Sequence, residues 1–113
     1  MFVVLFRSRL RDGYPQEEYE RTAERMLELA RQVRGFVSFD HYTNPAGDRL
    51  TVVRFETDGA VATWRTNVEH MQAQQRGREA FYTEYDVTVA EVRRAYQWSA
   101  SEVVSSLGTD AGS

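Results

Sequence analysis

The order in which the apolar periodicity changes along this chain constrains its fold more than any other feature. Apolar residues first form a continuous run and then recur at helical spacing. Two short strand-like segments follow, helical spacing then returns, and apolar residues alternate in the last segment. These segments cover residues 2–10, 15–34, 36–43, 49–56, 60–80 and 85–89. The pattern predicts the element order β-α-β-β-α-β.

Turn and capping residues separate the segments and support this order. Pro15 suits the start of the first helix, and Gly35 suits its C-terminal stop. The sequence NPAGD at 44–48 predicts a hairpin loop, and TDG at 57–59 predicts a break that caps a helix starting near residue 60. Asn67 is expected to cap a second helical piece that ends near residues 78–80.

This order predicts an α+β fold of the ferredoxin-like βαββαβ type, a four-stranded antiparallel sheet with helices on one face. The segments at 2–10 and 49–56, and partly that at 36–43, have apolar residues on both predicted faces. Because the helices cover only one face, a second layer must cover the other, and a second copy of the chain is the simplest source. We expect a homodimer with face-to-face sheets; the alternative is an open sheet with a mildly apolar outer face.

The end of the chain differs in composition from the rest. Residues 99–113 are rich in Ser, Gly and Ala, so we expect one domain over residues 1–97 and a mostly flexible tail over 98–113. Within that tail, a short docked turn is the alternative for Val103, Val104 and Leu107. A shift of the apolar phase toward Val92 and Tyr96 predicts a β-bulge near residues 90–91.

Composition excludes several classes of function. The chain of 113 residues has no Cys, which removes thiol nucleophiles, disulfides and thiolate metal sites, and all 14 cationic side chains are Arg. The absence of Lys removes Schiff-base chemistry. A net charge of -3 argues against a general nucleic-acid or anionic-membrane binder. No apolar run approaches a signal-peptide core or a membrane span, so a cytoplasmic location is expected.

Several segments resemble a known family. They are GFVS at 35–38, LTVVRFE at 50–56, ATWRTNVEH at 62–70, AQQRGR at 73–78 and YDVTVAEV at 85–92. With them, the chain is similar to the dimeric α/β barrel superfamily and resembles its antibiotic biosynthesis monooxygenase domain family. The resemblance covers about residues 2–97, and the Trp-x5-His segment followed by AQxxGR is fairly specific for the family.

The resemblance implies two oxygenase activities and one role without catalysis. One activity is oxygenation of a polyphenolic or quinone-forming aromatic compound by O2 without a bound cofactor. It needs an apolar cavity, a base and hydrogen-bond donors that stabilise the substrate anion. The other activity is binding and degradation of haem. A ligand-binding dimer without catalysis is the third possibility, and whether the chain is an enzyme stays open.

For the cofactor-independent activity, we expect the site in a cavity between the sheet and the helices. We expect no metal or cofactor ligands among its residues. Its catalytic candidates are His70, Trp64, Asn67 and Tyr85. Its substrate-binding candidates are Phe6, His41, Phe55, Phe81 and Tyr82. Further wall or polar candidates are Phe39, Tyr42 and Arg54.

Each prominent candidate also has a purely structural interpretation. Trp64 can be a core residue, because Val61, Trp64, Val68 and Met71 recur at helical spacing. On a regular helix His70 lies about 120° from that stripe, which favours a surface or interface position. His41 can be an ordinary strand residue, and Arg76 and Arg78 can make helix-end or inter-subunit contacts. The glutamates of the first helix predict a solvated face; they are Glu17, Glu18, Glu20, Glu24 and Glu28.

The haem alternative lacks its usual residues. Related haem-degrading proteins resemble the chain at Trp64 but place Asn on the first strand and an axial His about ten residues after the Trp. The matching positions here are Ser8 and Gln74, and Gln is a poor haem ligand. The three functions predict different interiors. An oxygenase needs an enclosed cavity beside Trp64 with a titratable group inside, and a haem protein needs a His aimed into that cavity. A dimer without catalysis would have the same space filled by Trp64, Met71 and Phe81.

Overall fold

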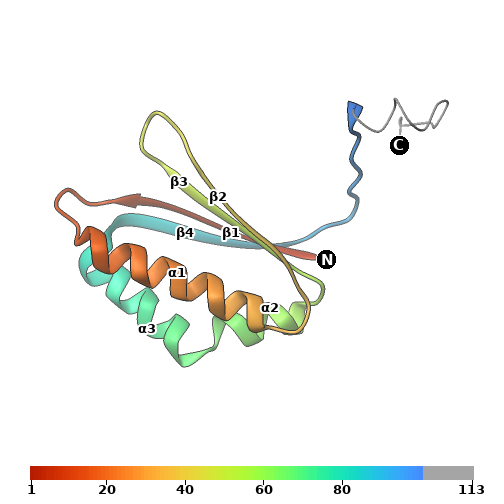
Figure 1. Cartoon of the computed structure of the whole chain (residues 1–113), viewed down its shortest axis with the longest axis horizontal. Helices are drawn as coiled ribbons and strands as arrows, with labels where there is room; N and C mark the ends of the chain where they lie inside the picture. Colours follow the sequence, from red (N-terminus) through yellow and green to blue (C-terminus); the bar gives the residue numbers. More distant parts are fainter. Residues whose placement is uncertain (101–113) are drawn as a thin grey trace.

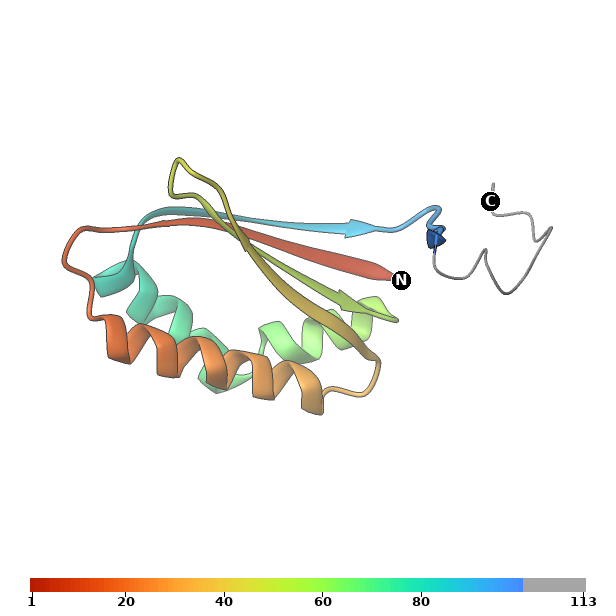
Figure 2. The ribbon, with the colours of Figure 1, turned by 45° about the horizontal axis from the view of Figure 1, so that its top comes forward.

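A computed structural model describes residues 1–100 of the chain and confirms the predicted element order. The elements are β1 (Phe2–Leu10), α1 (Gln16–Gln32), β2 (Phe36–Thr43), β3 (Arg49–Phe55), α2 (Asp58–Arg65), α3 (Val68–Arg76), the π-helical turn η1 (Gly77–Phe81) and β4 (Tyr82–Glu91). The strands form one layer and the helices a second layer on a single face (Figures 1 and 2). The fold is therefore the α+β, ferredoxin-like arrangement that the sequence predicts.

The four strands form an antiparallel sheet in the order β2-β3-β1-β4. Side chains of one strand alternate between the two faces, so the register assigns each residue to a face. Three successive rows across β3, β1 and β4 on the helix-covered face are Val53–Val4–Val89, Thr51–Phe6–Val87 and Arg49–Ser8–Tyr85. We call this helix-covered surface the inner face.

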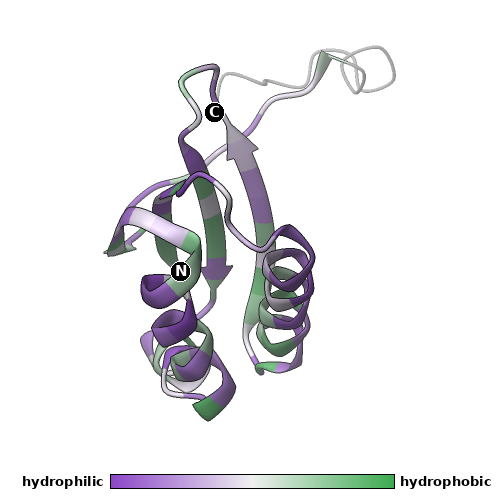
Figure 3. Cartoon of the chain, turned by 90° about the vertical axis from the view of Figure 1, so that its left-hand side faces the viewer, coloured by the Kyte–Doolittle hydropathy of each residue, from purple (hydrophilic) through white to green (hydrophobic). Residues whose placement is uncertain are grey.

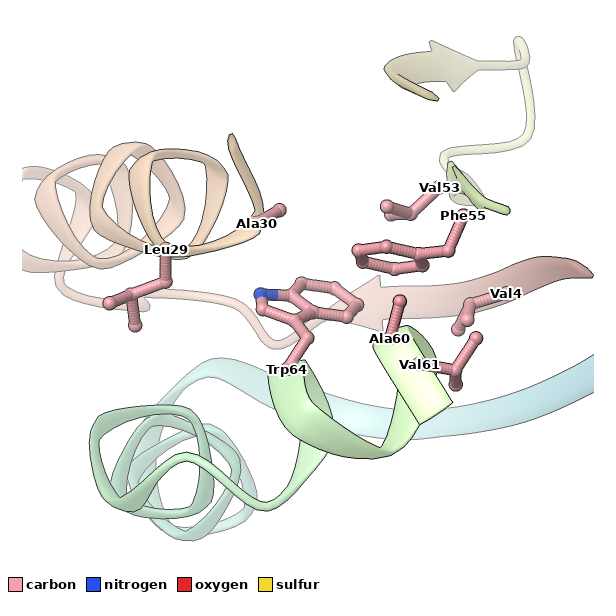
Figure 4. Packing of buried hydrophobic residues seen from close by; sticks show 8 residues of the cluster. All are labelled: Val4, Leu29, Ala30, Val53, Phe55, Ala60, Val61 and Trp64. Atoms are coloured by element: carbon pink, nitrogen blue, oxygen red, sulfur yellow. The ribbon is translucent and has the colours of Figure 1, made fainter. Parts of the chain in front are cut away.

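The core lies between the inner face and the helices. Trp64 of α2 packs between α1 and the sheet, and its indole Nε1 donates a hydrogen bond to the carbonyl oxygen of Met26 at 3.2 Å (Figure 4). The indole packs against Phe55 and Phe39 of the sheet at ring-centroid distances of 5.6 and 6.4 Å. The interpretation of Trp64 as a core residue is thus confirmed, with 6% of its surface exposed.

The helix caps follow the sequence. Thr57 Oγ1 accepts a hydrogen bond from the Ala60 backbone N–H at 3.0 Å and caps α2. Asn67 Oδ1 accepts one from the Glu69 N–H at 2.8 Å and caps α3. The predicted second helix is therefore two helices separated by Thr66 and Asn67.

This break overturns the expected positions of three side chains. Val68 and Met71 are 67% and 54% exposed, although their spacing from Trp64 predicted a continuous apolar stripe. His70 is buried, with 9% exposed, although a regular helix would have placed it at the surface. The physical reason is that Asn67 restarts the helix in a new direction, so angles counted from Trp64 no longer hold.

The helices α1 and α3 stand side by side under the sheet (Figure 3) and are joined by two bidentate ion pairs. Arg25 donates to both carboxylate oxygens of Glu69 at 2.8 Å. Arg76 donates to those of Glu18 at 2.6 and 2.8 Å. Glu18 is thus not simply part of a solvated face, and the pKa of its carboxyl is lowered by the hydrogen bond from Arg76.

The prediction of a β-bulge near residues 90–91 is wrong, because the irregularity lies at the other end of the last strand. The pairing of β1 with β4 is regular at residues 90 and 91, and it shifts between Arg9 and Leu10, near the start of β4. The apolar phase changes after residue 91 because the strand ends there: residues 92–99 have no regular structure. The turn expected at Val103, Val104 and Leu107 and most of the predicted tail lie outside the described residues.

The face of the sheet away from the helices, which we call the outer face, is apolar in the middle and charged around it. Its central residues are Val3, Leu5, Leu50 and Val52. Around them lie the ion pairs Arg7–Asp86 at 2.8 Å, Arg9–Asp48 at 2.8 Å and Arg54–Asp40 at 3.7 Å. No helix among residues 1–100 is both long and apolar enough to cross a membrane.

Candidate functional site

A cavity of about 330 Å³ lies between the inner face and the helices α1 and α3. This volume is at the lower end of the range of small-molecule pockets. Most of its wall is apolar or aromatic, including Val4, Phe6, Met26, Leu27 and Val87. The apolar wall follows from the fold, because helices and sheet each turn their apolar side toward the same space.

At one part of the wall, His70 packs edge-on against Trp64, with ring centroids 4.4 Å apart. Neither imidazole nitrogen makes a hydrogen bond with residues 1–100, and Nδ1 is fully buried. Of the two ring nitrogens, Nε2 is therefore the one left for a ligand. Burial and the nearby Arg65 guanidinium lower the pKa of His70 to about 4, so the ring is neutral at pH 7.

A second polar group consists of His41, Thr51 and Arg49. Arg49 Nη1 lies 3.3 Å from His41 Nε2, and His41 Nδ1 lies 3.1 Å from Thr51 Oγ1. Because a guanidinium can only donate, Nε2 must accept, and Nδ1 bears the proton. Partial burial and the Arg49 charge lower the pKa of His41, which keeps this imidazole neutral as well.

Aromatic rings from four elements line the cavity near Arg49. Phe6 packs against Tyr82 and Tyr85 with centroids 5.5 and 5.3 Å apart, and Tyr19 of α1 packs edge-on against Phe81 at 5.5 Å. Burial raises the pKa of the Tyr82 hydroxyl, so it stays protonated near neutral pH. The aromatic side chains therefore offer flat apolar surfaces together with phenol groups.

The structure brings together seven of the nine residues predicted for the site. The seven that line the cavity are Phe6, His41, Trp64, His70, Phe81, Tyr82 and Tyr85. Asn67 is not among the lining residues and uses its side chain as the α3 cap. Phe55 is fully buried in the core behind Trp64. The chemical roles of all nine stay predictions.

Two further polar candidates lie on the wrong side of the sheet. Tyr42 pairs with Leu50, and Arg54 pairs with Val3, so the register places both on the outer face. The cavity instead contains Arg49, Ser8 and Tyr19, whose polar groups were not predicted for the site. The alternation along β3 places Arg49 on the face of Val53 and Phe55 and Arg54 on the other. Because Leu50 and Val52 make that other face apolar as well, alternation alone did not identify Arg49.

Comparisons with known proteins identify the family. The family model described as "Antibiotic biosynthesis monooxygenase" matches residues 1–76, and the chain belongs to this family. The protein YqjZ of Bacillus subtilis (strain 168), described as uncharacterized, is 37% identical over 76 residues, which are 67% of each chain.

Solved structures show the same fold. Rv0793 from Mycobacterium tuberculosis matches with a TM-score of 0.73 and 18% identity, over 85% of this chain and 98% of that one. A variant of SnoaB, a cofactor-independent oxygenase from Streptomyces nogalater, matches with a TM-score of 0.69 and 10% identity, over 83% and 94%. The family and its neighbours thus define a small monooxygenase-type fold.

Proposed function

We propose that the protein is a small oxygenase that uses no bound cofactor and acts on an aromatic, quinone-forming compound with O2. The observation that supports this most is the cavity beside Trp64, because it is open to a ligand and has a neutral, unpartnered His70 in its wall. A dimer without catalysis was expected to fill this space with Trp64, Met71 and Phe81. Met71 instead points to the surface, with 54% exposed.

In the proposed reaction His70 acts as the base. A substrate phenol gives its proton to His70 Nε2, and the phenolate transfers one electron to O2 to give a substrate radical and superoxide. These two combine to a peroxide anion, which takes the proton back from the His70 imidazolium and becomes a hydroperoxide. The hydroperoxide loses water and leaves a quinone, so one O2 yields one carbonyl oxygen and one water. Although the pKa of His70 is about 4 without substrate, the phenolate formed beside it favours the imidazolium and raises that pKa during transfer.

The cavity would also favour the anionic substrate. Its mostly apolar walls strengthen electrostatic interactions, and two cationic residues, Arg49 and Arg65, are part of its lining. The phenol groups of Tyr82 and Tyr85 are hydrogen-bond donors in the same wall.

We further propose that the protein assembles as a homodimer through the outer face, where Leu5 and Val52 lie in the centre. Helices cover only the inner face. Neighbouring side chains already bury Val52, with 7% exposed, but Leu5 stays partly exposed and no helix of the described part of the chain lies over it. The charged rim on the same face would fix the orientation of the two copies.

Oxygen uptake with 1,5-dihydroxynaphthalene tests the proposed activity, with protein-free solution as the control for autoxidation. We expect protein-dependent uptake and quinone formation, and a loss of about 100-fold or more in kcat for His70→Asn, the usual contribution of a general base. His41→Asn is the matched control, because His41 is already held by Arg49 and Thr51, and it should lose far less.

Two results would contradict the proposal. One is the absence of protein-dependent uptake across a panel of dihydroxynaphthalenes and hydroxyanthrones. The other is a folded His70→Asn protein, shown by an unchanged circular dichroism spectrum, that keeps full activity.

Haem binding is the second candidate, because His70 brings an imidazole without hydrogen-bond partners to the cavity wall. Gln74 also lines the cavity but is a poor ligand, so His70, one helical turn earlier, is the residue that would hold the iron. Haem would supply an iron centre that activates O2. A haem titration read at the Soret band decides: a one-per-chain shift that His70→Ala abolishes and His41→Ala keeps supports haem, and no specific shift excludes it.

A further inference from the structure

Arg49 differs from the other arginines of the sheet in having no acidic partner. Arg7, Arg9 and Arg54 point to the outer face, and each lies within 4.0 Å of an Asp or Glu oxygen. Arg49 points to the inner face and lines the cavity, where no Asp or Glu oxygen of residues 1–100 lies within that distance. Arg49 is half-buried and therefore loses part of its hydration without an ion pair in return.

The contacts that Arg49 does make leave its charge uncompensated. Its Cζ lies 5.5 Å from the centre of the Tyr19 ring, and its Nη1 donates to the neutral His41. The carboxylate that lines the cavity within the described chain is Glu24 of α1, which is exposed and forms no ion pair with Arg49. The Tyr19 hydroxyl also lies within hydrogen-bond reach of Arg49. The positive charge thus faces an apolar cavity, and its contacts there are with neutral groups.

A second donor lies beside Arg49 in the floor of the cavity. Ser8 pairs with Arg49 across β1 and β3, is 2% exposed, and its hydroxyl makes no hydrogen bond with the described residues. A guanidinium and an adjacent unused hydroxyl are groups that bind a carboxylate or phenolate oxygen. The rings of Tyr19, Phe6 and Tyr82 stand around them and suit an aromatic body.

We propose that the cavity selects aromatic ligands with an anionic oxygen, a carboxylate or an acidic phenolate, which pairs with Arg49 and Ser8. This inference rests on the proposed function in taking the cavity as the aromatic site, and it adds the substrate class. Trp64 packs against Phe39, and Phe39 pairs with Val53 of β3. Val53 and Arg49 are four residues apart on that strand, a separation of roughly 13 Å. The anionic group therefore lies at the Arg49 end, and the reacting hydroxyl faces His70 at the other.

Calorimetric titration of the full chain with 2-naphthoate and with its neutral isostere 2-naphthamide tests this selection. We expect wild type to bind naphthoate at least about tenfold tighter than naphthamide, the lower range for a charge-assisted pair. Arg49→Gln should remove this preference while it keeps the naphthamide affinity, which also shows that the variant is folded. Arg54→Gln is the matched control, on the same strand but the outer face, and it should keep the preference.

A parallel titration with 4-nitrophenol separates the two sources of the anion, because its absorption shows whether the phenol or the phenolate is bound. A preference for naphthoate supports a carboxylate, and binding of nitrophenolate that Arg49→Gln abolishes supports a phenolate. Equal affinity of wild type for naphthoate and naphthamide, together with nitrophenol bound in its neutral form, would overturn the inference.

Failure of the proposed function gives a different pattern. If oxygen uptake is absent but Arg49 still sets the preference for anions, the cavity is a binding site for aromatic acids and the oxygenase proposal is wrong. If uptake depends on His70 but the affinities show no preference, the oxygenase proposal stands and the selection by Arg49 is wrong.

Discussion

Burial against Trp64 decides the chemistry of His70. The same indole that fills the core covers one side of the imidazole and leaves its Nδ1 without solvent or partner. A protonated ring there would be a buried charge beside Arg65, which is the reason its pKa falls to about 4. The residue is thus kept as a neutral base by packing and not by an acidic neighbour.

This burial makes the stability of the protein depend on pH. The unfolded chain has a histidine pKa near 6.5 and binds a proton as the pH falls below that value, whereas folded His70 does not until about pH 4. The neutral ring therefore contributes stability above pH 6.5 that is lost progressively as the pH falls toward 4. From pH 7.5 to 5.0 we expect a loss of about 2 kcal/mol from His70 alone.

Urea unfolding of wild type and His70→Asn at both pH values measures this loss as a difference between the two proteins. Because Asn does not titrate, the variant should be less sensitive to acid by about that amount. An equal loss of stability in both proteins would show that His70 titrates normally when folded.

At the scale of elements, the break between α2 and α3 aims His70 into the cavity. Asn67 caps α3, which starts in a different direction from α2. The two ion pairs from α1 then hold α3 in place. A single straight helix would keep Val68 and Met71 in the core and turn His70 outward. The cap is therefore a structural condition for the proposed base.

Replacing the two helix caps in turn tests this condition. Asn67→Ala and Thr57→Ala should each lower the free energy of unfolding by about 1 kcal/mol, the usual cost of an N-cap. Only Asn67→Ala should also move the pKa of His70 toward 6.5, which an NMR titration measures. Asn67→Ser preserves a capping oxygen, so it should keep both the pKa and oxygen uptake; loss of uptake with an unchanged pKa would instead give Asn67 a direct chemical role.

At the scale of the whole molecule, one face of the sheet has a helical layer and the other does not. The uncovered outer face is apolar at its centre and bordered by ion pairs, a composition that suits a specific interface better than bulk solvent. A second copy would bury the centre and leave the charged pairs at the edge.

Light scattering coupled to size-exclusion chromatography tests the assembly. We expect a mass twice that of the 13.1 kDa chain for wild type, and a monomer for Leu5→Asp, because a carboxylate would be buried without a partner. Val68→Asp is the matched control on the exposed side of α3 and should stay dimeric. A monomer for wild type, or dissociation by Val68→Asp alone, would contradict a dimer through the outer face.

Local patterns in the sequence were sufficient to predict the elements, their order and their caps. Apolar periodicity separates strands from helices, and the side chains of Thr57 and Asn67 cap helices through backbone groups two or three residues away. The ferredoxin-like arrangement then follows from the order of the elements, and the family resemblance rests on the same local segments. These features depend on interactions between residues that are close together in the sequence, so the sequence alone is enough to predict them.

Tertiary structure alone decided which polar groups meet in the cavity. Strand β3 is apolar on both parities, with Leu50 and Val52 on one face and Val53 and Phe55 on the other, so the sequence did not show whether Arg49 or Arg54 faced inward. The turn at Asn67 similarly exchanged the expected positions of His70 and Met71. Both outcomes depend on sheet register and on the angle between two helices, which are set by contacts between residues far apart in the chain.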